Sequence, residues 1–347
     1  MLAGITAALH IGKLPAALPT LETALNINLV EAGFLLSLTQ LAGVFLGLAI
    51  GLTADRFGLR KNILTGLGLL LAASFIGGWA SSALLLMLTR AVEGLGFLLT
   101  VLPVPGLLRS LVPAKKLNRM LAIWSCYMGL GVALAMLLGP SVIGWLGWQG
   151  WWWALTAFTL IVILGVLAKV PADQQANTAN PALPSGWVRI KQTLSLPGPW
   201  LIGICFGLYA GQWLSIVGFL PSLYSQVGFA AGQIGLLTAL VALVNVLGNL
   251  LSGLLMHRGF APQKLLMAGF VSVGVFSFLT FHYLNTNNPW LGYFSVLLFS
   301  ALGGLIPSSL FALAVKLAPN EHTISTTVGF MQQWSSFGQL ILPPSIA

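Results

Sequence analysis

Charged side chains are scarce in this sequence. Only 6% of its 347 residues are Asp, Glu, Lys or Arg, whereas 57% are hydrophobic and the mean hydropathy is +0.94. A soluble domain carries about 25% charged residues, because its surface has to face water. The scarcity excludes a soluble globule, and the sequence predicts an all-α protein embedded in a lipid bilayer.

Cysteine and histidine are also rare. The two cysteines, Cys126 and Cys205, both lie inside apolar segments, which favours small packing residues over a disulfide framework. Four scattered histidines predict no metal site, and no cofactor is expected. The phosphate-binding pattern G-x-x-x-x-G-K-[ST] does not occur, so ATP is not the evident source of energy.

What the sequence does contain is a series of apolar runs of spanning length. About 20 residues are needed to cross the hydrocarbon core as a helix. The first run is short and opens at Met1 without a charged leader, so it is interpreted as a first helix clipped at its cytoplasmic end. Eleven spans are predicted, near 1–18, 30–53, 62–80, 82–107, 119–143, 149–169, 197–221, 231–256, 264–283, 289–315 and 322–347.

The basic residues predict how the spans are oriented. Thirteen of the 15 lysines and arginines fall in alternate loops on one face, and the opposite loops contain none. The positive-inside rule makes that face cytoplasmic, which predicts a multi-pass protein of the inner (plasma) membrane. Because the net charge of +9 lies in short loops, nucleic acid is not an expected partner. Lys13 and Arg90 are the exceptions, since both lie within spans.

An internal repeat predicts two halves. At an offset of 202 positions, Pro19, Gly33 and Arg56 match Pro221, Gly235 and Arg258. The predicted domains are an N-terminal helix bundle at 1–169, a cytoplasmic linker at 170–196 and a C-terminal bundle at 197–347. Parallel repeats of this kind place the substrate between the halves near the bilayer midplane. The repeat also predicts a twelfth span near 351–371, so the chain is expected to be a fragment or to have lost that helix.

Gly51-Leu52-Thr53-Ala54-Asp55-Arg56-Phe57-Gly58-Leu59-Arg60-Lys61 follows the second span. It resembles the loop signature of the major facilitator superfamily, G-x-L-a-D-r-x-G-r-k. The resemblance implies two pseudo-symmetric six-helix bundles and a cytoplasmic gate. An acid beside a helix end can lock one conformation through charge pairing. The residues implied in the gate are Gly51, Asp55, Arg56, Gly58, Arg60 and Lys61; an ordinary charged turn is the alternative.

The fourth span carries a second part of the resemblance. Arg90-Ala91-Val92-Glu93-Gly94-Leu95-Gly96 is similar to the superfamily's R-x-x-q-G-x-g segment, with Glu93 in place of glutamine. Residues three apart share a helix face, so Arg90 and Glu93 can pair. The functional hypothesis is that Glu93 takes up and releases a proton while Arg90 biases it. A static, self-neutralising pair is the alternative.

Two further segments resemble particular branches. Gly139-Pro140-Ser141-Val142-Ile143-Gly144 resembles the G-P-x-x-G kink of exchangers and exporters, with a plain packing kink as the alternative. Gly139 and Pro140 are therefore added to the predicted gate. Gly12-Lys13-Leu14-Pro15 is similar to the cyanate-permease and nitroimidazole-resistance branch.

Polar residues within the spans are the candidates for the substrate pathway. His10 and Lys13 lie one turn apart on a helix that borders the central cavity in the superfamily. The alternative for His10 is a packed, hydrogen-bonded histidine, and the alternative for Lys13 is a side chain that reaches the membrane interface. Lys13 and Arg90 carry two positive charges against the one negative charge of Glu93. This net positive charge within the spans favours an anionic or zwitterionic substrate. The other candidates are Tyr209, Gln212, Trp213, Gln332 and Gln333, each with packing as its alternative.

Two more groups of residues are assigned structural roles. Asn245 and Asn249 are interpreted as interhelical hydrogen-bonding residues. Trp145, Trp148, Trp151, Trp152 and Trp153 are interpreted as an aromatic belt at the outer boundary.

The predicted function is secondary active transport of a small organic solute by alternating access, coupled to protons, by a monomer that is not an enzyme. Proton-antiport efflux of amphiphilic drugs, facilitated diffusion and a non-transporting membrane sensor are the alternatives.

Overall fold

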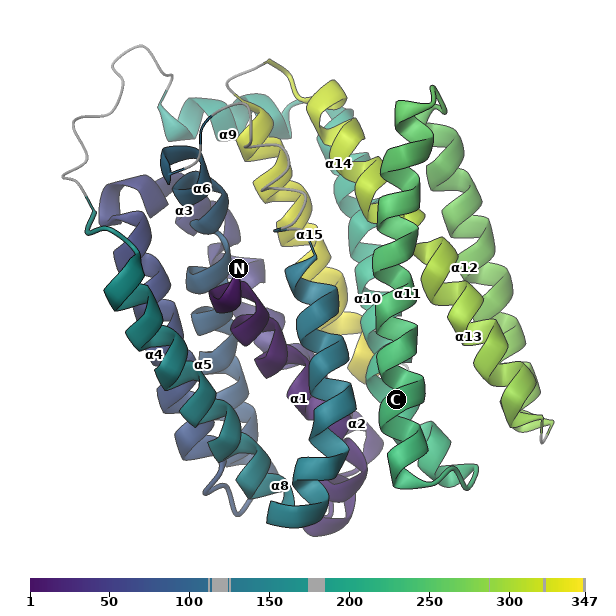
Figure 1. The fold of residues 1–347 in the computed structure, drawn as a ribbon. Helices are drawn as coiled ribbons and strands as arrows, with labels where there is room; N and C mark the ends of the chain where they lie inside the picture. Colours follow the sequence, from purple (N-terminus) through teal and green to yellow (C-terminus); the bar gives the residue numbers. More distant parts are fainter. Residues whose placement is uncertain are drawn as a thin grey trace.

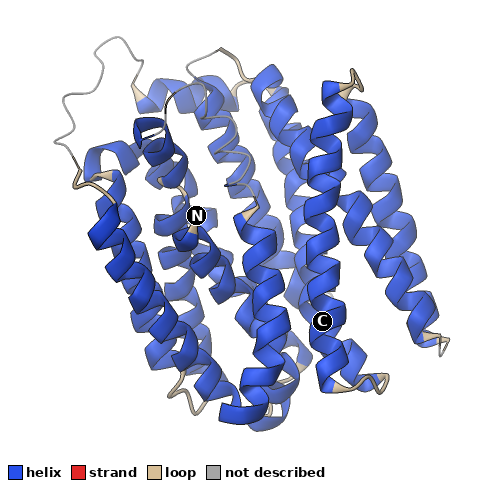
Figure 2. Cartoon of the chain, in the orientation of Figure 1, coloured by secondary structure: helices blue, strands red, loops and turns tan. Residues whose placement is uncertain are grey.

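The structure is a computed structural model that describes residues 1–347 except 112, 114–123, 125, 174–184, 287, 321–322 and 346–347. The side chains of 51–57, 105–106, 109–110, 231, 285 and 325 are also outside the description. The regular secondary structure of the described residues is entirely helical (Figure 2). The helices are α1 (Leu2–Ala24), α2 (Leu29–Ser37), η1 (Leu38–Gln40), α3 (Leu41–Phe57), α4 (Leu59–Gly77), α5 (Ala83–Val101), α6 (Val104–Leu111), α8 (Tyr127–Lys169), α9 (Gly186–Leu194), α10 (Pro197–Gln226), α11 (Ala231–His257), α12 (Pro262–Asn285), α13 (Pro289–Gly303), α14 (Leu305–Leu317) and α15 (Ile324–Ser345).

Eight helical segments in the described part of the chain are long and apolar enough to cross a bilayer. One of them, α8, has 43 residues and changes direction at Gly147, whose φ of 72° and ψ of 172° are not helical. This break separates the predicted fifth and sixth spans. Large apolar side chains such as Phe45 and Phe278, each 70% exposed, cover the outside of the bundle. The protein is therefore a multi-pass membrane protein.

The first helix is longer than the run predicted from the sequence. It continues to Ala24, six residues beyond the predicted end at 18, although Pro15 and Pro19 lie inside it. The next helix begins with a reciprocal cap, because the Asn28 side chain accepts from the Glu31 N–H at 2.9 Å and the Glu31 carboxylate accepts from the Asn28 N–H at 3.0 Å. Such caps satisfy the free N–H groups of a helix start.

Two groups of helices lie on the two sides of the molecule, and α15 is a helix of the second group that faces the first (Figure 1). In the first group α1 packs against α4, α5 and α8; in the second, α10 packs on α15, and α11 and α12 pack on α13 and α14. The groups meet where α15 packs on α2 and α3, where α8 packs on α11, and where α1 packs on α10. The boundaries at 169 and 197 stay a prediction.

The tryptophan cluster corrects the prediction of an aromatic belt. Trp145 is 84% exposed, but Trp148, Trp151 and Trp152 are buried in the core of the first helix group. The helix direction changes at Gly147, and the tryptophans that follow it at 148, 151 and 152 are buried. Only the exposed Trp145 and the partly exposed Trp153 of this cluster fit an interfacial position.

Candidate functional site

Four ionisable side chains meet inside the first helix group. His10 and Lys13 lie one turn apart on α1, and Arg90 and Glu93 lie one turn apart on α5. All four are at most 1% exposed. Burying charged groups costs several kcal/mol per ion unless they are paired and hydrogen-bonded. The lysine therefore does not reach the membrane interface, and its pairing within the bundle is what makes its burial possible.

Glu93 joins the two cations through separate oxygens. Its Oε2 accepts a hydrogen bond from Arg90 Nη1 at 2.6 Å, and its Oε1 accepts from Lys13 Nζ. The pairing of Arg90 with Glu93 follows the prediction. The second pair, across 80 residues, was not predicted.

Lys13 Nζ has two further acceptors. Ser74 Oγ on α4 lies 2.9 Å away, and since this hydroxyl donates its own hydrogen to the Trp152 carbonyl at 3.0 Å, it accepts from the lysine. His10 Nδ1 lies 3.3 Å from Nζ. Nζ also lies 4.6 Å from the centre of the Trp152 ring, a cation–π distance. Three acceptors match the three N–H groups of an ammonium.

The hydrogen bonds of His10 determine its tautomer. Thr159 Oγ1 donates to the Leu155 carbonyl at 2.7 Å, so it accepts from His10 Nε2 at 2.9 Å. A proton on Nε2 leaves Nδ1 as the lone-pair acceptor that faces Lys13. His10 is therefore a hydrogen-bonded neutral imidazole in this arrangement, and it links α1 to α8.

Arg90 holds three helices together. Its Nη1 donates to the His10 carbonyl at 2.6 Å, and its Nε donates to the Leu35 carbonyl of α2 at 3.3 Å. We call the set His10, Lys13, Ser74, Arg90, Glu93 and Thr159 the charge cluster. It contains two cations and one anion, and all the hydrogen-bond partners named above come from residues 1–169.

The candidates on α10 hydrogen-bond to their neighbours in the second helix group. Tyr209 Oη accepts from Asn245 Nδ2 at 2.9 Å, which agrees with the interhelical role predicted for Asn245. Gln212 donates to Ser277 at 2.8 Å, and Trp213 donates to Ser300 at 3.2 Å. These residues lie in a different part of the molecule from the charge cluster.

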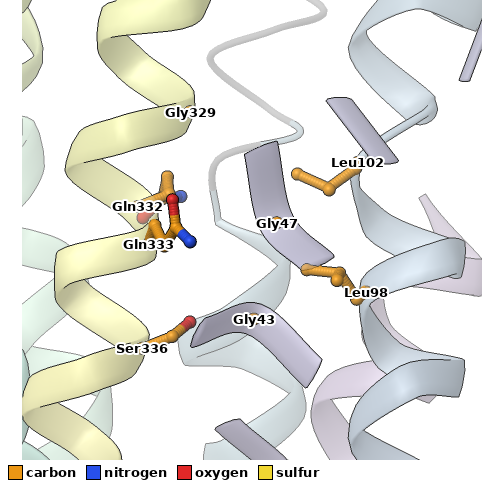
Figure 3. A pocket seen from close by; sticks show the side chains of 8 residues that line it. All are labelled: Gly43, Gly47, Leu98, Leu102, Gly329, Gln332, Gln333 and Ser336. Carbon is orange, nitrogen blue, oxygen red and sulfur yellow. The ribbon is translucent and has the colours of Figure 1, made fainter. Parts of the chain in front are cut away.

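Gln332 and Gln333 lie at a cavity between α3, α5 and α15 (Figure 3). About 230 Å³ of space there is free of protein atoms, and this volume includes open solvent. Gln333 Nε2 donates to the Val44 carbonyl of α3, whereas Gln332 is exposed. The full lining is Gly43, Gly47, Leu98, Leu102, Gly329, Gln332, Gln333 and Ser336.

The predicted gate loop is held by an acid that sequence reasoning missed. Asp173, four residues after the end of α8, accepts from the N–H groups of Arg60 at 2.8 Å and Lys61 at 3.0 Å, and so caps the start of α4. Arg60 also donates through Nη2 to the Leu167 carbonyl at 2.8 Å. The side chains of Asp55 and Arg56, like those of the rest of 51–57 and thus Gly51, lie outside the described residues, so their predicted gating role stays a prediction.

We expect Gly58→Ala to lower the free energy of unfolding by about 1–3 kcal/mol. Gly58 has a φ of 90°, and a Cβ there would overlap the Asp173 carboxylate. Gly68→Ala on α4 is the matched control, because a Cβ there meets nothing within 4 Å. SDS-induced unfolding in mixed micelles measures both variants; equal stability would show that the Asp173 cap does not depend on Gly58.

The Gly139-Pro140 segment makes close contacts on two sides. A Cβ on Gly139 would lie 2.7 Å from Ala16 Cβ of α1, and the Pro140 ring lies 3.0 Å from the position of a Cβ on Gly235 of α11. The helix continues through Pro140. These contacts fit the packing alternative, and the predicted gating role stays a prediction.

Comparison with known proteins identifies the family. The sequence profile of the Major Facilitator Superfamily matches residues 1–343. The chain belongs to this superfamily. It is therefore a membrane transporter of small solutes rather than an enzyme, as the sequence predicted.

The relatives of this superfamily member are distant. It is 27% identical over 267 residues to the 2-nitroimidazole transporter of Escherichia coli (strain K12), covering 74% of this chain and 66% of that protein. It is 24% identical over 326 residues to the cyanate transport protein CynX of the same organism, covering 91% of this chain and 79% of that protein. Both lie in the branch that the Gly12-Lys13-Leu14-Pro15 segment resembles.

Solved transporters of the superfamily share the fold. A D-xylose-proton symporter superposes with a TM-score of 0.78 at 16% identity, covering 99% of this chain and 87% of that one. A point mutant of the nucleoside transporter NupG gives a TM-score of 0.78 at 14% identity, with 99% and 89% covered. At such identities the likeness supports the fold alone.

Proposed function

We propose that this transporter moves a small organic anion or zwitterion by alternating access, coupled to protons, across the inner membrane. The charge cluster carries the proposal. Two buried cations face one carboxylate, which leaves one positive charge without a protein counter-ion among the described residues of the cluster. Charged residues within membrane spans generally mark substrate or proton pathways.

The net positive charge of the charge cluster attracts an anion even where the anion does not contact the cluster. A unit charge 8–10 Å away contributes roughly 2 kcal/mol at an effective dielectric constant of about 20. Leu98, which lines the cavity, follows Glu93 by five residues on α5, roughly 7–8 Å along the helix axis. The cavity therefore does not need to contain a cation to attract an anion. The relative named for cyanate supports the proposal, because cyanate is a small anion.

Contacts at one end of the bundle support alternating access between two halves. At the end opposite the basic loops, Ser222 of α10 donates to Glu22 of α1 at 2.9 Å. A Cβ on Gly33 of α2 would lie 2.6 Å from Pro344 Cα of α15. Such close packing shuts that end, while the cavity lies nearer the other. We propose that the halves are 1–169 and 197–347, and that the linker and the basic loops are cytoplasmic.

We expect cyanate to raise the melting temperature of the purified protein and the lipophilic cation tetraphenylphosphonium to leave it unchanged, because binding stabilises the folded state. In Lys13→Gln the cyanate affinity is expected to fall roughly tenfold or more, since the cluster loses its unbalanced charge. Lys264→Gln is the matched control, because Lys264 is exposed at the start of α12.

Stabilisation by tetraphenylphosphonium in place of cyanate, indifferent to Lys13, would contradict the anion assignment. It would favour the efflux alternative that rests on Gly139 and Pro140.

A further inference from the structure

We infer that Lys13, rather than Glu93, carries the proton that the transporter exchanges. The inference rests on the proposed proton coupling and names its carrier. The groups that face Lys13 Nζ from the packed helices are His10 of α1, Ser74 of α4, Glu93 of α5 and Trp152 of α8, with Arg90 on the far side of Glu93. The contacts of each titratable side chain show whether it can gain or lose a proton.

Neither Arg90 nor Glu93 fits the role of carrier. A guanidinium does not lose its proton in a protein. The Glu93 carboxylate accepts from one cation on each oxygen. A proton on it would remove the only anion of the cluster and leave two buried cations with no counter-ion, and uncompensated buried charge is strongly unfavourable.

His10 does not fit either. Its Nε2 proton is held by Thr159, so a second proton would have to sit on Nδ1. That atom lies 3.3 Å from Lys13 Nζ and 3.7 Å from Glu93 Oε1, so the new N–H would compete with the ammonium for the same carboxylate oxygen. The cluster would then contain three cations and one anion.

Lys13 is the member that can change its charge without leaving a worse imbalance. As an ammonium it donates to Glu93, Ser74 and His10, and the cluster has a charge of +1. When the ammonium releases one proton to water, it becomes a neutral amine, and Arg90 and Glu93 remain as a balanced pair. A buried lysine changes protonation readily, unlike arginine.

The arrangement also indicates when the proton leaves. All four ionisable members of the charge cluster are at most 1% exposed, so Nζ is shielded from bulk solvent in this conformation. Release requires movement of α1 relative to α4 or α8, the helices that contribute Ser74 and Thr159. A change of conformation would thus give Lys13 access to water on one side at a time, which is the requirement for coupling.

The Trp152 ring reports the charge of Lys13 without any substrate. We expect the fluorescence difference between the full chain and its Trp152→Phe variant, recorded in detergent from pH 5 to 10, to show a one-proton transition. The transition should disappear in Lys13→Met, which leaves the Arg90–Glu93 pair intact, and in Lys13→Arg, whose charge is fixed. It should persist in His10→Gln. A transition that survives Lys13→Met, or its absence from the unmodified protein, would overturn the inference.

Transport by the same variants separates this inference from the proposed function. In proteoliposomes, Lys13→Arg, which keeps the positive charge of the cluster, should lose at least ten times more of the cyanate uptake driven by a pH gradient than of the cyanate counterflow. Gradient-driven uptake by Lys13→Arg at the unmodified level would overturn the inference. If the unmodified protein does not exchange cyanate, the proposed substrate class is wrong, and the Trp152 titration still decides whether Lys13 exchanges a proton.

Discussion

In Glu93→Gln, the free energy of unfolding is expected to fall by about 3–5 kcal/mol, as for other buried ion pairs that lose one partner. The carboxylate accepts from both Arg90 and Lys13, and all three side chains are at most 1% exposed. The glutamine keeps the shape but leaves two cations facing each other in a medium without water. SDS-induced unfolding in mixed micelles measures the loss.

A second substitution gives this prediction a sharper test. Adding Lys13→Met to Glu93→Gln removes one of the two unpaired cations, so the double variant should be more stable than Glu93→Gln alone. Lys13→Met alone should be close to the unmodified protein, because it leaves one balanced pair. A double-mutant cycle gives the coupling between the two sites. Additive losses would contradict the charge balance on which the account depends.

In Gly33→Val, the rate of cyanate transport is expected to fall at least tenfold. The position of a Cβ on Gly33 lies 2.6 Å from Pro344 Cα and 2.9 Å from Pro343 C, both backbone atoms of α15. A valine would prevent α2 from packing on α15 at this end, and the conformation closed there would become less populated. A tenfold loss of rate corresponds to about 1.4 kcal/mol.

Gly232→Val is the matched control for this effect. Gly232 lies near the start of α11, at the same end of the bundle, and a Cβ there meets nothing within 4 Å. Its transport rate should stay within about twofold of the unmodified protein, since surface substitutions rarely change stability by more than about 0.5 kcal/mol. Equal rates in both glycine variants would show that closure at this end does not limit transport.

The helical spans could be predicted from the sequence because their signal is local. The apolar run at 197–221 corresponds to α10, which is five residues longer than predicted, and the run at 231–256 corresponds to α11, which is one residue longer. The extra turns are polar or contain proline, as in α1, where the helix continues past Pro19. Composition cannot show that such a turn is held by contacts with another helix.

The charge cluster could be predicted only in part. Arg90 and Glu93 share one helix, so their spacing alone predicts the pair. The bond from Lys13 to Glu93 spans 80 residues and depends on how α1 packs on α5. Ser74 and Thr159 gave a weak signal, as polar residues in apolar spans, but nothing in the sequence assigned them to Lys13 and His10.

Two features depended on backbone turns that the sequence does not display. Trp148, Trp151 and Trp152 lie around a glycine-rich turn between two apolar runs and so resemble an interfacial belt, but they are buried in the core after the positive φ of Gly147. Asp173 lies far from the 51–61 motif in sequence, and it meets Arg60 only because the end of α8 lies beside the start of α4.

Proton movement during transport tests the central claim most directly. Proteoliposomes that contain the protein and the trapped pH indicator pyranine are given cyanate without an imposed pH gradient, with protein-free liposomes as the control for passive diffusion. We expect a cyanate-dependent change of internal pH in the unmodified protein. In Lys13→Arg, which keeps the positive charge of the cluster, this pH change should fall at least ten times more than cyanate exchange does. Cyanate transport by the unmodified protein with no change of internal pH would contradict the central claim.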